Sequence, residues 1–305
     1  MSIEKTVKPF FPFKSQKTKT EYYDFHNSRA LKWNVSYEEK MYHTSFGQTY
    51  VRTCGFVDGE PLVLMHGGGD NSSSWAPNIE ALSNNYHVYA IDAINASNMS
   101  VCTRPIKDLS EILSWMDELF CLIGIKEKIH IVGMSYGAYL SARYELTYPE
   151  KVASAILIAP PNFIIPNSGK FVMGVLSTII PLRFFTKRFF YWCFRDMAKS
   201  GGEEGRKIID LFIDNYMMIR KCYTIQKFIN PKVFSKEELH RLTVPTYFMI
   251  GEHDINYSAA KAIKQLNSVA PQIKTHVFKN AGHDLPLLLP SEVNEKILNF
   301  LKRNK

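Results

Sequence analysis

The feature that most constrains the fold of this chain is a glycine-flanked motif, G-M-S-Y-G, at residues 133–137. It follows an apolar run at residues 129–132 and precedes a helix-like stretch at residues 138–143. A G-x-S-x-G between a buried strand and a helix is the pattern of a nucleophile elbow, a turn so tight that its neighbours must be small. Such a turn would lift the Ser135 hydroxyl out of a sheet. There the N-terminus of a helix favours developing negative charge.

The rest of the chain alternates between short apolar runs and helical patterns. The apolar runs lie at residues 61–65, 86–91, 129–132, 153–158, 246–250 and 274–278, and the helical patterns at 74–83, 108–123, 258–268 and 291–303. Ahead of them, residues 41–43 and 49–52 flank Phe46-Gly47-Gln48 and predict a β-hairpin. Buried strands that alternate with helices predict an α/β protein with a mostly parallel central sheet and helices on both faces. In such sheets the chemistry gathers beyond the carboxyl ends of the strands.

Residues 161–235 interrupt this alternation. Within them Leu182, Phe185, Phe189 and Trp192 fall at helical spacing, and two glycines separate this helix from a second one near residues 203–221. We interpret residues 161–235 as a helical lid inserted between two strands. Most of its aromatic side chains are expected to pack on the domain below, and a few to line an apolar substrate pocket.

The remaining segments complete the predicted organisation. Residues 1–30 show no clear period and predict an arm on the surface. Residues 31–160 and 236–305 are expected to form the core. With 305 residues, the chain is long enough for a large core and one or two domains.

The composition excludes several classes of function. The net charge of +8 is not gathered in one long basic run, and no nucleic-acid motif accompanies it, which argues against nucleic-acid binding. The five cysteines have irregular spacing and no C-x-x-C pair, so neither a disulfide framework nor a zinc site is predicted. No export signal and no apolar segment of membrane-spanning length is present. We therefore expect a cytoplasmic protein without stable membrane insertion; nothing in the sequence specifies its oligomeric state.

The base that the serine requires is predicted from chain order. A serine hydroxyl is a weak nucleophile and needs a histidine within hydrogen-bond reach, with a carboxylate to hold the tautomer of that histidine. In elbow-type hydrolases the order is serine, acid, histidine. His283 lies in a loop after a strand and before a helix, so it is the predicted base. The other downstream histidines are weaker candidates, because His240 precedes a strand, His276 lies within one and His253 is expected to be structural.

The acid is expected in the loop that follows the apolar run at residues 246–250. Asp254 is preferred there and Glu252 is the alternative. Asp284 adjoins the predicted base, but neighbouring side chains usually diverge, so we interpret it as a loop residue. Asp92 ends a strand and is expected to anchor the loop that follows it.

Acyl transfer also needs two donors for the oxyanion of the tetrahedral intermediate. The backbone N–H of Tyr136 is the predicted donor from the elbow. The second is expected from the glycines that follow His66, since glycine lets the backbone turn its N–H groups toward a ligand. Gly68 is preferred and Gly69 is the alternative, while His66 is interpreted as a brace for the loop.

Taken together, these motifs resemble the α/β-hydrolase superfamily from about residue 40 onward. The motifs that carry the resemblance are Leu64-Met65-His66-Gly67-Gly68, the elbow at 133–137, Gly251-Glu252-His253-Asp254 and Ala281-Gly282-His283. Serine at the elbow separates the chain from the haloalkane dehalogenases and epoxide hydrolases, which carry aspartate there. With residues 74–79, the chain looks most like bacterial carboxylesterases. It departs from many relatives in the loop after Asp92, which is not glycine-rich.

The resemblance implies a serine hydrolase that cleaves small or medium carboxylic esters through an acyl-enzyme on Ser135. Thioesters, lactones, carbon–carbon bonds in β-diketones and N-terminal proline amides are alternative substrates for the same triad. A non-catalytic ligand receptor on the same fold is the alternative of another class, and the complete serine, histidine and aspartate set argues against it. No cofactor or metal is expected, because H-E-x-x-H, P-loop and G-x-G-x-x-G motifs are absent.

Overall fold

The computed structural model describes residues 10–224 and 228–304, which form a nine-stranded sheet covered by helices. The strands are β1 (Glu38–Thr44), β2 (Gly47–Gly55), β3 (Pro61–Met65), β4 (His87–Ile91), β5 (Val101–Cys102), β6 (Ile129–Met134), β7 (Val152–Ile158), β8 (Thr246–Gly251) and β9 (Lys274–Phe278). Their order in the sheet is β1-β2-β4-β3-β6-β7-β8-β9, with β5 paired to β2. The first two strands form the expected antiparallel hairpin, and β3, β4 and β6 to β9 are parallel.

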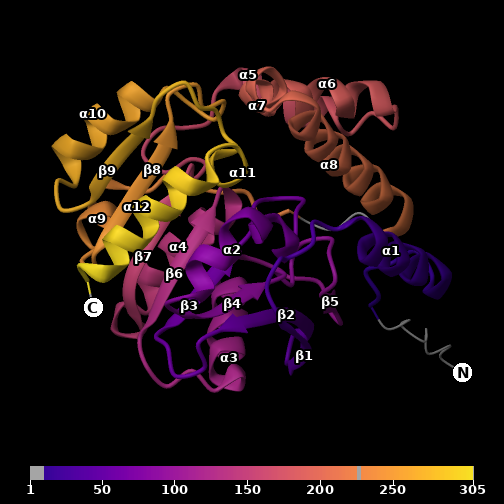
Figure 1. The fold of residues 1–305 in the computed structure, drawn as a ribbon, viewed down its shortest axis with the longest axis horizontal. Coiled ribbons are helices and arrows are strands. Elements are labelled where there is room, and N and C mark those ends of the chain that lie inside the picture. The colour runs from indigo at the N-terminus through magenta and orange to yellow at the C-terminus, as the bar shows by residue number, and fades with distance from the viewer. Residues whose placement is uncertain (1–9, 225–227, 305) are drawn as a thin grey trace, which may run out of the picture.

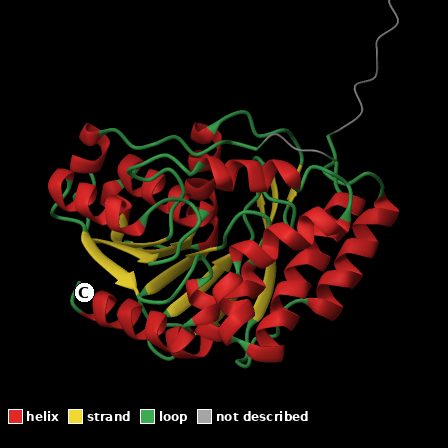
Figure 2. Ribbon diagram, turned by 90° about the horizontal axis from the view of Figure 1, so that it is seen from above, coloured by secondary structure: helices red, strands yellow, loops and turns green. Residues whose placement is uncertain are grey.

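Helices cover both faces of the sheet, as Figures 1 and 2 show. Helices α2 (Ala76–Ser83) and α12 (Pro290–Lys302) pack on one face, and α3 (Leu109–Ile123), α4 (Tyr136–Thr147) and α10 (Ala259–Val269) pack on the other. Successive side chains of a strand point to opposite faces. Leu62 and Leu64 of β3 accordingly join the core beneath α2 and α12, whereas Val63 and Met65 join the core beneath α3 and α4. The predicted α/β architecture is therefore confirmed.

The signals in the sequence explain where these helices begin and end. Helix α3 begins after Asp108, whose side chain accepts a hydrogen bond from the backbone N–H of Glu111, and ends at Gly124 with φ 87°. Its buried apolar side chains, which include Ile112, Leu113 and Met116, belong to the core beneath the sheet. The strands at 61–65 and 274–278 have the predicted bounds, and the bounds of the other predicted strands differ by up to three residues. The helix predicted at 74–83 begins as a short 3-10 turn, η1 (Ser72–Trp75).

Four helices lie between β7 and β8, in the segment interpreted as a lid: α5 (Gly169–Ser177), α6 (Arg183–Cys193), α7 (Arg195–Ser200) and α8 (Gly202–Cys222). They lie at the upper edge of the molecule in Figure 1, and the short α9 (Lys236–His240) leads back into the sheet. Sequence reasoning predicted only two of the four. Helix α5 was missed because its apolar residues do not alternate with polar ones, and α7 because a single residue, Phe194, separates it from α6.

The segment expected to be a surface arm, residues 1–30, contains a helix where the structure describes it. Residues 1–9 lie outside the described part, but residues 16–29 form α1 (Gln16–Arg29), with Tyr22 and His26 buried. Helix α1 packs along α8, and the Tyr22 hydroxyl donates to Asn215 Oδ1 of that helix at 3.3 Å. The partner of these aromatic side chains comes almost two hundred residues later, so a local period could not reveal the contact.

One buried carboxyl in α4 makes the stability of the fold depend on pH. Glu145 is 1 % exposed; its Oε1 accepts the Thr246 hydroxyl at 2.9 Å, while Oε2 has no hydrogen-bond partner among the described residues. Burial raises the pKa of Glu145 from its usual 4.5 to about 8. Between these two values the folded protein keeps a proton that the unfolded chain has released, so the free energy of unfolding falls as the pH rises through this interval.

We predict that Glu145→Gln removes this dependence. Glutamine can still accept from Thr246 but does not ionise. The stability of the variant relative to the unsubstituted protein should therefore increase by roughly 1–3 kcal/mol between pH 5 and pH 8.5. Denaturant unfolding at several pH values measures it, with the difference at pH 5 as the internal reference. Two parallel stability curves would contradict the prediction.

Candidate active site

The elbow serine sits in a backbone conformation that its glycine neighbours make possible. Ser135 links β6 to α4 with φ 50°, in the left-handed region that non-glycine residues rarely adopt. A Cβ at Gly133 would lie 2.4 Å from the backbone nitrogen of Ala138, and one at Gly137 would lie 2.3 Å from the carbonyl oxygen of Met65. Both positions thus require glycine. The N–H of Ser135 donates to the carbonyl of Ile158 at 2.7 Å, which fixes the turn to β7.

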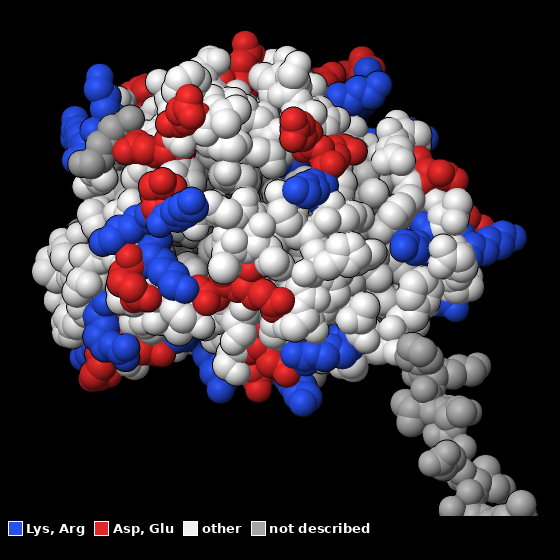
Figure 3. Space-filling view, turned by 90° about the horizontal axis from the view of Figure 1, so that it is seen from below, with Lys and Arg blue, Asp and Glu red and all other residues white. Residues whose placement is uncertain are grey.

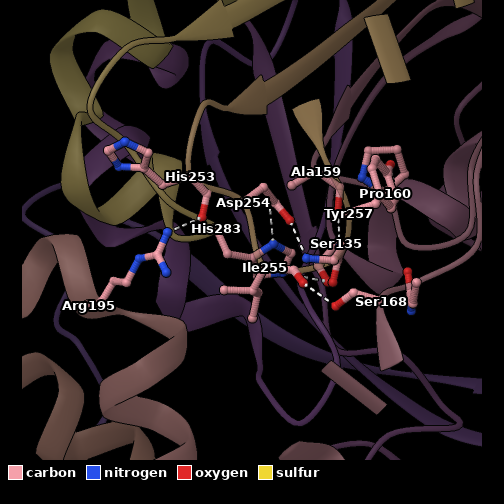
Figure 4. A network of polar contacts seen from close by, with 12 residues as sticks. Ser135, Ala159, Pro160, Ser168, Arg195, His253, Asp254, Ile255, Tyr257 and His283 are labelled. Carbon is pink, nitrogen blue, oxygen red and sulfur yellow. Dashed lines mark hydrogen bonds and ion pairs between the residues drawn. The ribbon is translucent and has the colours of Figure 1, made fainter. Parts of the chain in front are cut away.

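The three predicted catalytic side chains meet at the carboxyl ends of the strands (Figure 4). His283 Nε2 lies 3.0 Å from Ser135 Oγ, and His283 Nδ1 lies 2.9 Å from Asp254 Oδ2. The other oxygen of Asp254 accepts from the backbone N–H of Asn256 at 2.7 Å, so the fully buried carboxylate is held on both sides. The structure brings Asp254, not Glu252, to the histidine. Glu252 is exposed and accepts from the backbone N–H of Asn280 at 3.0 Å.

The surroundings of His283 act on its pKa in opposite directions. Burial disfavours the charged imidazolium and lowers the pKa, while the negative charge of Asp254 and the hydrogen bond to it raise it. The charge of Asp284 adds to the second effect, and the net result is a pKa above the usual 6.5. An imidazole in this setting can take up a proton from the serine hydroxyl, because the developing positive charge faces a fixed carboxylate.

The glycines after β3 lie beside the elbow. Gly67 and Gly68 line the same cavity as Ser135, and a Cβ at Gly68 would lie 3.7 Å from the Cβ of Tyr136. Gly69 has φ +74° and faces open space, and its carbonyl accepts from Asn215 Nδ2 of α8 at 3.3 Å. The N–H of Tyr136 opens α4, where backbone donors have no partner within the helix. This geometry favours Gly68 over Gly69 as the second oxyanion donor.

His66 and Asp92 have the bracing contacts that were expected of them. His66 Nε2 accepts from the backbone N–H of Ala93 at 3.0 Å, and its Nδ1 lies 2.7 Å from the carbonyl of Gly67. Asp92 accepts backbone N–H groups of Ser72 at 2.7 Å and Met99 at 3.1 Å. These contacts tie the loop after β3 to the loop after β4.

The other histidines downstream of the serine belong to other contacts or elements. His253 Nδ1 is 3.3 Å from Asp196 Oδ2 of α7, and its carbonyl accepts from Arg195 at 3.1 Å. His276 in β9 is 3.9 Å from a carboxylate oxygen of Glu292, and His240 lies in α9.

A cavity of about 560 Å³, counted to its open mouth, lies over the serine. Phe190, Phe194 and Phe212 of the helical insertion form one wall, and Trp75 and Met134 lie on the side of the core. The wall is apolar, which suits a hydrocarbon group attached to the reacting carbonyl.

Two acidic residues of this cavity were not recognised from the sequence. Asp284, interpreted as a loop residue, is 1 % exposed, and neither carboxylate oxygen has a hydrogen-bond partner among the described residues. Burial raises its pKa to about 7, and burial raises the pKa of Asp70 to about 6. The position of Asp284 directly after the base was the available signal. It was discounted because adjacent side chains usually diverge.

In the described part of the chain, no three His, Cys, Asp or Glu side chains are grouped so that they could hold a metal ion. A search of residues 10–224 and 228–304 finds no helix with the length and apolarity needed to cross a bilayer.

Comparison with known proteins agrees with this geometry. The model of the alpha/beta hydrolase family matches residues 62–296. A carboxylesterase of Bacillus subtilis (strain 168), nap, is 30 % identical over 289 residues, which cover 92 % of this chain and 91 % of that protein. The crystal structure of naproxen esterase from Bacillus subtilis superposes with a TM-score of 0.84 at 29 % identity, covering 94 % of this chain and 99 % of that one. For the Bacillus subtilis carboxylesterase CesB (YbfK) the TM-score is 0.80 at 26 % identity, over 93 % and 98 % of the two chains.

The chain therefore belongs to the α/β-hydrolase family. Within that family it is a carboxylic ester hydrolase, similar to the carboxylesterases of Bacillus subtilis.

We predict that Asp254→Asn lowers kcat/KM by roughly 10³–10⁴-fold and shifts the acid limb of its pH profile to lower pH. Neutral imidazole is the reactive form, and the substitution removes the charge that raises the pKa of His283 while leaving the burial that lowers it. Ester hydrolysis measured from pH 5 to 9 tests both effects. The matched control is Glu252→Gln in the same loop, which should change kcat/KM by no more than about twofold. A loss of kcat/KM in the control as large as that in Asp254→Asn would indicate that Glu252, and not Asp254, is the orienting acid.

Proposed function

We propose that the protein is a serine hydrolase that cleaves carboxylic esters of small or medium size through an acyl-enzyme. The observation that carries the proposal is the 3.0 Å contact between Ser135 Oγ and His283 Nε2, with Asp254 on the far side of the imidazole. This is the arrangement of nucleophile, base and orienting acid that acyl transfer requires.

In the proposed mechanism, Ser135 Oγ attacks the ester carbonyl while His283 Nε2 takes its proton. The oxyanion accepts hydrogen bonds from the N–H groups of Gly68 and Tyr136. His283 then gives its proton to the departing alcohol, which leaves the acyl group on Ser135. A water molecule, deprotonated by the same imidazole, attacks the acyl-enzyme; the carboxylic acid leaves and Ser135 regains its hydrogen. The carboxylate of Asp254 stabilises the imidazolium.

The cavity supports the proposed substrate class. Its aromatic wall from α6 and α8 favours an apolar acyl or alcohol group. The triad is also compatible with thioesters, lactones, carbon–carbon bonds in β-diketones and N-terminal proline amides, so a substrate panel that includes them tests the assignment.

We predict that Ser135→Ala reduces turnover of p-nitrophenyl esters by roughly 10⁵–10⁶-fold without a change in melting temperature, because the nucleophile alone is removed. A fluorophosphonate probe should label the unsubstituted protein but not Ser135→Ala. The control is Ser110→Ala, which replaces an exposed serine of α3 and should still be labelled. Absence of labelling in the folded, unsubstituted protein would instead support a non-catalytic ligand receptor.

We also predict that Phe190→Ala shifts the acyl-length preference toward longer chains. Removing a ring from the cavity wall makes room for added methylene groups, each worth about 0.8 kcal/mol when buried. The ratio of kcat/KM for octanoate over acetate esters should therefore rise roughly tenfold. Phe184→Ala is the control, since Phe184 belongs to the same helix but is 67 % exposed to solvent. An equal shift in both variants would show that the wall does not select the chain length.

A further inference from the structure

An unusual concentration of exposed apolar side chains lies on α5, α6 and the turn between them. Residues 172–184 hold eight of the fourteen exposed large apolar side chains among the described residues. We call these eight the apolar face: Val172, Met173, Val175, Leu176, Ile179, Ile180, Leu182 and Phe184. Met173, Ile179 and Phe184 are each about two-thirds exposed. An exposed patch of this kind on a folded protein usually marks a binding surface.

The apolar face is built into the fold. Gly174 of α5 packs against the ring of Phe189 in α6, where a Cβ would lie 2.9 Å from the ring, so α5 has one side seated on α6. Arg220 of α8 donates to the carbonyl of Ile179 at 2.8 Å and also binds the carbonyl of Thr178. These hydrogen bonds anchor the backbone of the turn to α8. Thr178 is buried, whereas the side chains of residues 179–182 are exposed.

The charged residues of the segment that carries the apolar face have one sign. Residues 161–195 contain five Lys or Arg residues and no Asp or Glu. Arg183 pairs with Asp214 of α8 at 2.6 Å, whereas Lys170, Lys187 and Arg188 are exposed. The opposite side of the molecule is different, because Figure 3, seen from below, shows Lys and Arg interspersed with Asp and Glu.

The apolar face and the cations of the same segment are complementary to a surface in which a negatively charged outer layer covers an apolar interior. We propose that the apolar face docks on an anionic lipid bilayer. Its aliphatic side chains would enter the boundary between headgroups and acyl chains, and Lys170, Lys187 and Arg188 would contact lipid phosphates. A second copy of the chain suits the face less well, because a two-fold contact would bring like charges together. Since α6 also carries Phe190 of the cavity wall, the bilayer would lie on the active-site side of the molecule.

The test is flotation of the full-length protein with vesicles of phosphatidylcholine alone and of phosphatidylcholine mixed with phosphatidylglycerol. We expect binding to the mixed vesicles to be roughly 10–100-fold tighter, since each cation near an anionic surface adds to the attraction. This preference should weaken as salt is added.

Two paired variants separate the apolar and charged contributions. Ile179→Ser with Phe184→Ser should lower binding to mixed vesicles at least tenfold, and Lys187→Glu with Arg188→Glu should abolish the preference for phosphatidylglycerol. Phe56→Ser with Val57→Ser is the matched control, because the two residues have a similar exposure, 62 % and 75 %, but lie between β2 and β3. All three should hydrolyse a water-soluble ester at the unsubstituted rate, which shows that they are folded.

Three results would overturn the proposal. The first is no flotation of the unsubstituted protein with mixed vesicles, and the second is an equal loss of binding in the Phe56 and Val57 control. The third is light scattering that finds a dimer which Ile179→Ser with Phe184→Ser converts to a monomer, since the apolar face would then be an interface between copies of the chain.

Discussion

The backbone of Ser135 is the constraint on which the site depends. Its positive φ is unfavourable for a residue with a side chain, and the turn persists because Gly133 and Gly137 let α4 and the end of β3 approach within contact of it. The hydrogen bond to the carbonyl of Ile158 joins this turn to β7. The position of the hydroxyl is therefore set by the packing of three strands and a helix. His283 and Asp254 lie on loops, and these loops need only the right length to bring the imidazole and the carboxylate to the serine hydroxyl.

The cavity around Ser135 and His283 holds a further acidic residue, Asp284, which the proposed mechanism does not use. Asp254 is stabilised by two hydrogen bonds, whereas Asp284 is buried beside the same imidazole with no partner among the described residues. A buried carboxyl without a partner costs stability when it ionises, and its charge also favours the imidazolium. The stability of the fold and the basicity of His283 thus respond to the same carboxyl in opposite directions.

The sequence was sufficient for the parts of the molecule that depend on local rules. The strands of the parallel sheet are continuous apolar runs, α3 carries its cap and its stripe, and the elbow is a short motif with a steric cause. Chain order then selected His283 and Asp254, which lie within hydrogen-bond distance of their expected partners. Features that depend on distant contacts were missed. Helix α1 is ordered by α8, α5 by α6 and α8, and the burial of Asp284 follows from the helices that cover it.

The contact between α1 and α8 has a consequence for the loop over the serine. Asn215 of α8 accepts the Tyr22 hydroxyl through its carbonyl oxygen and donates to the carbonyl of Gly69 through its amide nitrogen. One amide thereby couples the N-terminal helix to the glycines beside the elbow. Any event that loosens the first helix, such as a proteolytic nick ahead of the sheet, would be transmitted to the glycine backbone beside the elbow, although no atom of that helix lies next to Ser135.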